Sequence, residues 1–188
     1  MGKYYKGKYR IPSARAEWHD YNDGSYFITI CTEHRKYYFG QIIDKQMHLS
    51  PLGQRAKYCI EQIPVIHPHT KIPHYVIMPD HIHLIIVIIP QKNGNDNAAA
   101  ETPYYDVSAA NPPSIKKNDK KSMRDIANCC GQLSHIISRF KWAVTQFAHK
   151  NELPFAWQAR FHDHIIRNQT EMERIARYIE NNVANWKK

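Results

Sequence analysis

The sequence predicts an α+β domain in which helices are packed on one face of an antiparallel sheet. Two observations favour this class. Short β-branched and aromatic segments are interleaved with three longer segments of helical character. The chain has 188 residues, of which 43% are apolar and 23% charged, the size and composition of one ordinary globular domain. We therefore expect a single domain spanning residues 1–188.

The strand candidates are rich in β-branched and aromatic residues. They comprise residues 26–32, 37–43, 47–49, 74–78 and 81–89. The last of these is apolar on both faces beyond Leu84, which is typical of a central strand. Residues 1–25, which precede the first strand, are basic, aromatic and rich in turn formers, and we interpret them as an arm.

Three helices are predicted. Ser50 is placed to cap a helix that carries Pro51 at its first position and ends before Pro64. A second helix is expected over residues 123–150, where apolar residues recur near helical spacing. The last is expected over residues 170–186, with a similar apolar stripe.

Residues 90–121 interrupt this pattern, because Asn, Ala, Pro and Lys replace the periodic apolar residues. A segment of this kind predicts an irregular, mobile linker. Its end carries four lysines that are candidate DNA contacts: Lys116, Lys117, Lys120 and Lys121. The formal net charge of +9 favours a polyanionic partner, either nucleic acid or an anionic membrane surface.

Several classes of protein are disfavoured. The longest apolar run, residues 84–89, is far shorter than the ~20 residues that span a bilayer, and the basic N-terminus has no apolar segment behind it. The four cysteines (Cys31, Cys59, Cys129 and Cys130) include no CxxC pair, so neither a cysteine zinc site nor a secreted disulfide framework is predicted. We expect a reduced, cytoplasmic protein that does not enter a membrane.

His81-Ile82-His83 is the most informative triplet. On a strand, side chains at positions i and i+2 point to the same face, roughly 6.5–7 Å apart, so the two imidazoles can converge on one metal ion. The triplet alone is also typical of two structural histidines at a strand end. Both interpretations stay open at this point.

Tyr178 and Asn182 are one helical turn apart and share a face of the last predicted helix. A tyrosine flanked by Ile175 and Ile179 is commonly a residue at the edge of the core. A nucleophilic role needs a nearby metal to polarise the target phosphate, because a free phenol, with a pKa of roughly 10, is a poor nucleophile at neutral pH. Asn182 can supply a neutral oxygen ligand to such an ion.

Residues 157–168 mix aromatic residues, histidines and two arginines. One interpretation is a packed loop that anchors the last helix. The other is a DNA-binding surface, in which Trp157 stacks on an unpaired base while Arg160 and Arg167 contact phosphates.

Three blocks together resemble the single-tyrosine HUH transposases, in particular the branch called REP-associated tyrosine transposases. They are residues 75–85, which contain the His-Ile-His triplet, residues 157–168 and residues 176–182. The resemblance implies a ferredoxin-like or RRM-like antiparallel sheet with helices on one face. By position it implies that His81, His83 and Asn182 bind a divalent metal ion, Mg²⁺ or Mn²⁺, and that Tyr178 is the nucleophile. The family often has Asn-Pro where this chain has Asn182-Val183, which is why the last helix is expected to continue to Trp186.

The resemblance also implies an activity. The protein would be a metal-dependent single-stranded DNA endonuclease and strand transferase of DNA transposition, acting through a 5′-phosphotyrosine on single-stranded or hairpin DNA. Two alternatives are a catalytically silent nucleic-acid-binding module with structural histidines and a regulator that binds DNA hairpins. The sequence leaves open whether the chain acts as a monomer or a homodimer, and whether Tyr178 acts in cis or in trans.

Overall fold

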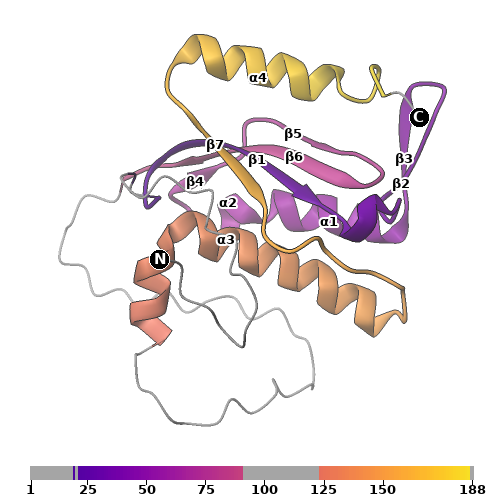
Figure 1. The fold of residues 1–188 in the computed structure, drawn as a ribbon, viewed down its shortest axis with the longest axis horizontal. Coiled ribbons are helices and arrows are strands. Elements are labelled where there is room, and N and C mark those ends of the chain that lie inside the picture. Colours follow the sequence, from indigo (N-terminus) through magenta and orange to yellow (C-terminus); the bar gives the residue numbers. More distant parts are fainter. Residues whose placement is uncertain (1–18, 20, 91–122, 187–188) are drawn as a thin grey trace, which may run out of the picture.

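The computed structural model describes residue 19, residues 21–90 and residues 123–186. The strands are β1 (Gly24–Cys31), β2 (Gly40–Ile43), β3 (Gln46–Leu49), β4 (Thr70–Lys71), β5 (Tyr75–Ile77), β6 (His81–Ile88) and β7 (His162–Ile166). The helices are the short 3₁₀ turn η1 (Glu33–Arg35) and the α-helices α1 (Pro51–Glu61), α2 (Ile63–Ile66), α3 (Met123–Lys150) and α4 (Gln169–Asn181). Figure 1 shows their arrangement.

The main sheet is antiparallel and centred on β6 and β1. These strands pair along their full length, from Gly24 opposite Ile88 to Cys31 opposite His81. β7 pairs with the other edge of β1, while β4 and β5 pair with successive parts of the free edge of β6. β2 and β3 form a separate two-stranded hairpin.

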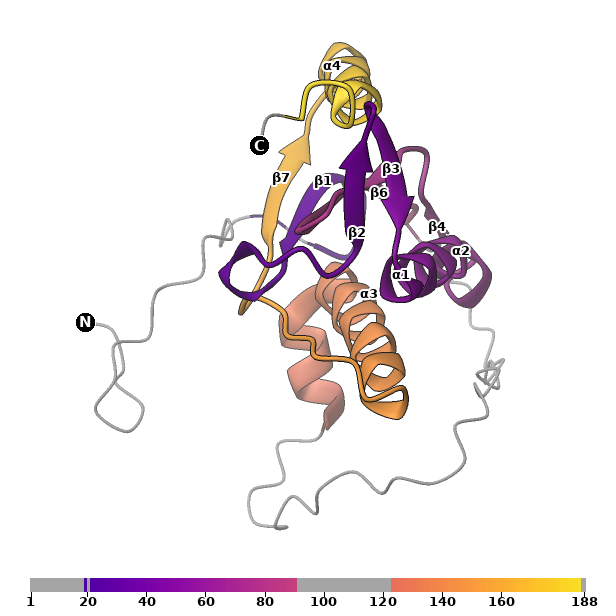
Figure 2. The ribbon, with the colours of Figure 1, turned by 90° about the vertical axis from the view of Figure 1, so that its right-hand side faces the viewer.

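Helices cover both faces of this sheet (Figures 1 and 2). On one face, Tyr26, Ile28 and Ile30 of β1 and alternate residues of β6 join a core with α1 and α3. On the other face, Ile175 and Ile179 of α4 pack against Ile85 of β6 in a smaller apolar cluster.

The predicted α+β class with an antiparallel sheet is therefore confirmed, and α1 and α3 share one face as expected. The position of α4 corrects the expectation that all helices lie on one face. β6 is buried at seven of its eight positions, so the sheet presents apolar side chains on both sides and needs a cover on each.

The element boundaries agree with the sequence in part. The Ser50 hydroxyl accepts a hydrogen bond from the amide of Gly53 at 3.1 Å, which confirms the predicted cap of α1. α4 begins one residue earlier than predicted and ends at Asn181, and residues 182–185 continue as turns, so the predicted extension to Trp186 was wrong. β7 was not predicted.

Two predicted features lie largely or wholly outside the described residues: the basic arm at 1–25 and the linker at 90–121 with its four lysines. No helix in the described part of the chain has the length and apolar character that a membrane span requires.

Candidate active site

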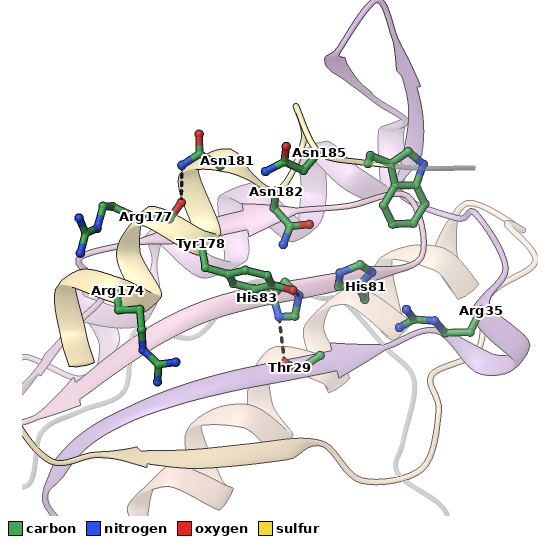
Figure 3. Close-up of a pocket in the computed structure, with 11 residues that line it drawn as sticks. Thr29, Arg35, His81, His83, Arg174, Arg177, Tyr178, Asn181, Asn182 and Asn185 are labelled. Atoms are coloured by element: carbon green, nitrogen blue, oxygen red, sulfur yellow. Dashed lines mark hydrogen bonds between the residues drawn. The ribbon is translucent and has the colours of Figure 1, made fainter. Parts of the chain in front are cut away.

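A cleft of about 680 Å³ lies between α4 and the sheet (Figure 3). The described residues that line it include three arginines, two histidines and three asparagines, but no acidic side chain. They are Thr29, Arg35, His81, His83, Arg174, Arg177, Tyr178, Asn181, Asn182, Asn185 and Trp186. A cleft of this composition favours an anionic ligand.

Strand alternation brings the histidines to this cleft. His81 and His83 are two residues apart on β6, so both point to the face that α4 covers. His83 lies opposite Thr29 on β1, and the Thr29 hydroxyl oxygen and Nδ1 of His83 are 2.8 Å apart. The centroids of the two imidazoles are 4.5 Å apart.

The packing of α4 brings in the remaining two predicted residues. Its apolar stripe, anchored by Ile175 and Ile179, contacts the sheet and turns the adjacent helix face, with Tyr178, toward β6. Asn182 caps the helix one turn later, and Figure 3 shows its amide on the side of the histidines. All four residues predicted as ligands or nucleophile therefore line one cleft.

His83 is held in the neutral state by its surroundings. Its side chain is 6% exposed, and its ring stacks on Phe27 at 5.1 Å between centroids. Burial, followed by the charges of His81 and Arg35, lowers the pKa of His83 to about 3, while Asp80 opposes this shift. Its Nε2 lies 3.3 Å from the hydroxyl oxygen of Tyr178.

His81 is held by a buried carboxylate. Its Nδ1 is 2.5 Å from one carboxylate oxygen of Asp80, and the other oxygen forms an ion pair with Nε of Arg35 at 3.0 Å. The backbone of Arg35 is left-handed, with φ of 56°, an uncommon conformation for a residue with a side chain. A carboxylate on the second ring nitrogen is the usual partner of a metal-binding histidine.

These contacts fit a metal ion. Both imidazoles use Nδ1 for a protein partner, so Nε2 is the nitrogen that each can offer to an ion, and in His83 an ion at Nε2 would replace the contact with the Tyr178 hydroxyl. Among the described residues no group of three or more His, Cys, Asp or Glu side chains could hold a metal. An ion bound here would therefore depend on the amide oxygen of Asn182, or on oxygen atoms of the substrate, beside the two histidines.

The predicted DNA contacts of residues 157–168 lie away from the cleft. The Trp157 ring packs on Phe39 and Phe155 within the core on the α3 side, and its Nε1 donates a hydrogen bond to the carbonyl of Lys141 at 3.1 Å. Arg160 and Arg167 are exposed at opposite ends of β7. The packed-loop interpretation thus holds for Trp157, and DNA contacts by these residues stay a prediction.

Sequence reasoning did not single out the three arginines that line the cleft, Arg35, Arg174 and Arg177, nor the carboxylate of Asp80 that contacts His81. Asp80 could have been suspected, since it directly precedes His81 and is acidic. Arg174 and Arg177 lie within one helical turn of Tyr178 and could have been found by helical spacing. Arg35 is distant in sequence, and no local pattern indicates it.

No family model matches the chain. A protein of Haemophilus influenzae (strain KW20), described as an uncharacterized protein, is 37% identical to it over 186 residues, covering 98% of this chain and 94% of that protein. The solved structure of a REP-associated tyrosine transposase bound to a REP hairpin matches it with a TM-score of 0.50 and 18% identity, covering 92% of this chain and 79% of the other. The chain therefore belongs to one family with the H. influenzae protein and has the fold of the REP-associated tyrosine transposase, as its three sequence blocks predict.

Proposed function

We propose that the protein is a metal-dependent enzyme that nicks and rejoins single-stranded DNA, as tyrosine transposases do. The observation that carries this proposal is the contact between the Tyr178 hydroxyl and Nε2 of His83 at 3.3 Å, inside a cleft without acidic lining residues. The shared fold with a transposase solved on a DNA hairpin supports it.

Tyr178 is suited to act as the nucleophile. Its side chain is 52% exposed, so a bulky phosphodiester can reach the phenol oxygen. Its ring is nevertheless oriented by edge contacts with Phe27 and His83, at centroid distances of 6.1 and 5.4 Å. An exposed hydroxyl on a ring held in this way is what attack on a large substrate requires.

In the proposed reaction the phenol oxygen of Tyr178 forms a bond to phosphorus and the bond from phosphorus to the 3′ oxygen breaks. The phenol loses its proton, and the leaving 3′ oxygen gains one. The products are a 5′-phosphotyrosine and a free 3′-hydroxyl. Because the phosphodiester is exchanged and not hydrolysed, a 3′-hydroxyl can reverse the step and join DNA.

The metal would be held by His81, His83 and Asn182. When bound, Mg²⁺ or Mn²⁺ neutralises negative charge on the attacked phosphate. Asp80 orients His81, and Thr29 orients His83.

The arginines of the cleft bind the DNA backbone in this proposal. Arg174 and Arg177 begin and end the helical turn that precedes Tyr178, and both line the cleft. Arg35 lies beside His81 (Figure 3). A guanidinium binds phosphate through paired hydrogen bonds, so these side chains can hold the phosphates that flank the reacting one.

The test is formation of a covalent adduct. The full chain is incubated with a pool of labelled single-stranded hairpin oligonucleotides and Mn²⁺ or Mg²⁺, and protein–DNA bands are sought on a denaturing gel. We expect an adduct that Tyr178→Phe abolishes while DNA binding stays within a few-fold. Tyr58→Phe is the matched control, because Tyr58 is exposed on α1, on the opposite side of the sheet. A normal adduct from Tyr178→Phe would contradict the assignment.

A DNA-binding module without catalysis is the second candidate. It is favoured by the small metal-binding set, two histidines and one amide among the described residues. This candidate predicts tight binding of the same oligonucleotides with no adduct at any concentration of either metal.

A further inference from the structure

Trp186 lies at the end of the cleft next to His81. Its ring centroid is 5.9 Å from that of His81, at an interplanar angle of 36°, and 6.2 Å from that of Tyr37. Tyr37 is itself 56% exposed. Two large aromatic rings therefore stand side by side at the rim of a cationic cleft.

Packing of the core does not account for this indole. Trp186 belongs to neither of the two apolar clusters formed by the described residues. Trp157 offers the contrast, because its ring packs within the core and its indole nitrogen is hydrogen-bonded to a backbone carbonyl. The backbone at Trp186 is held by a turn, in which its amide donates to the carbonyl of Val183 at 3.3 Å.

The neighbours of the indole suit a nucleobase. Asn182 and Asn185 line the same cleft as Trp186, and their side-chain amides offer donors and acceptors of the kind that bind base edges. Along α4 and its C-cap, Arg174, Tyr178 and Asn182 follow one another every four residues, a rise of about 6 Å each time, and Trp186 is four residues further on. A strand laid along α4 with one phosphate at Tyr178 would place a neighbouring base at the Trp186 end.

We infer that Trp186, backed by Tyr37, is a stacking site for an unpaired nucleobase beside the phosphate that reacts with Tyr178. This inference rests on the proposed function, since it requires single-stranded DNA in the cleft. A base stacked on Trp186 would fix the position of the strand in the cleft and so determine which phosphate reaches the phenol oxygen of Tyr178. Duplex DNA cannot use the site, because paired bases do not expose their faces.

The test separates stacking from charge. Two probes carry the same number of phosphates: a dT 15-mer and a 15-mer of abasic nucleotides. Binding of each is measured on the full chain carrying Tyr178→Phe, so that no cleavage occurs. We expect Trp186→Ala to weaken binding of the dT 15-mer about 5- to 150-fold, which is about 1–3 kcal/mol at 1.4 kcal/mol per tenfold change, and to leave binding of the abasic 15-mer unchanged.

Three further variants sharpen this result. Trp142→Ala is the matched control, because Trp142 is 53% exposed on α3, on the far side of the sheet, and we expect it to change neither affinity. Trp186→Phe keeps an aromatic face and should stay within a few-fold of the parent on both probes. Arg174→Gln should weaken both probes equally. Circular dichroism melting of each variant verifies that the protein is folded.

Several results would overturn the inference. One is an unchanged dT affinity in Trp186→Ala. A second is an equal loss on both probes, and a third is a gain in affinity, which would show that the indole occupies space the strand needs. If Trp186→Ala does not fold, the folded Trp186→Phe variant decides. Because it keeps an aromatic face, a large loss of its affinity for the dT 15-mer alone would contradict stacking. Absence of binding to either probe by the parent would instead overturn the single-strand substrate of the proposed function, and the inference with it.

Discussion

Nε2 of His83 lies 3.3 Å from the hydroxyl oxygen of Tyr178, although the two residues are 95 positions apart in the sequence. One ring comes from the central strand and the other from the helix that crosses it. Phe27 contacts both rings and fixes their relation, stacked on His83 and edge-on to Tyr178. A buried, neutral imidazole is thereby kept within one hydrogen bond of an exposed phenol.

His81→Ala and His83→Ala should each remove cleavage and weaken binding of Mn²⁺. The expected loss of metal affinity exceeds about 10-fold, because removing even an outer partner of a ligand typically costs about 10–100-fold. Mn²⁺ binding can be followed by electron paramagnetic resonance, and adduct formation on a denaturing gel. His48→Ala is the control, since His48 is exposed on β3. Unchanged cleavage in both variants at limiting metal would return the two residues to a structural role.

Asp80→Asn tests the buried carboxylate. The amide keeps the size of the side chain but lacks the charge that pairs with His81 and Arg35. We expect Mn²⁺ affinity to fall about 10–100-fold in a folded protein. In His81→Ala, the added Asp80→Asn change should cost little further metal affinity, because the residue acts through His81. Fully additive losses would show that Asp80 acts by another route.

The arginines of the cleft should appear in the salt dependence of DNA binding. For a single strand, each phosphate contact adds about −0.7 to the slope of log K against log salt. Arg174→Gln and Arg177→Gln should each make the slope less steep by about that amount. Lys57→Gln is the control, because Lys57 is an exposed residue of α1, and it should leave the slope unchanged. Replacing Lys116, Lys117, Lys120 and Lys121 should flatten the slope further if that segment contacts DNA. Binding that is insensitive to salt would exclude all these phosphate contacts.

Local spacing predicted the two halves of the candidate site. Alternation along a strand pairs His81 with His83, and one helical turn pairs Tyr178 with Asn182. Neither the strand alternation nor the helical spacing predicts that the histidine pair lies close to Tyr178 and Asn182. Their meeting was expected only from the resemblance to a family, and in the structure it depends on α4 packing across β6.

Other features escaped prediction for physical reasons. β7 is an edge strand whose inward and outward positions are mostly polar or half-exposed, so it lacks the apolar signature of a strand. An amphipathic pattern says that α4 has a buried side but not which face of the sheet it covers. Arg35 lines the cleft and has a left-handed backbone, which no periodicity marks.

A cluster of histidines on the α3 side of the sheet predicts acid sensitivity. Burial, followed by Arg139, His135 and His69, lowers the pKa of His67 from 6.5 to about 4. Between pH 6.5 and about 4, His67 is protonated in the unfolded chain but neutral in the folded protein. The free energy of unfolding therefore falls as the pH drops through this range. Above pH 6.5 both states are neutral at this residue and the effect vanishes.

His67→Gln should therefore make stability less dependent on pH. Urea unfolding at pH 7 and pH 5 gives the loss of free energy of unfolding for each protein, and we expect a smaller loss in the variant than in the parent. His48→Gln is the control, because His48 is exposed and lies on a different element. The pKa of His135 is lowered as well, by burial and then by Arg139, so part of the parent's loss should persist in His67→Gln. Equal losses in parent and variant would show that the folded protein accepts a proton at His67 as readily as the unfolded chain does.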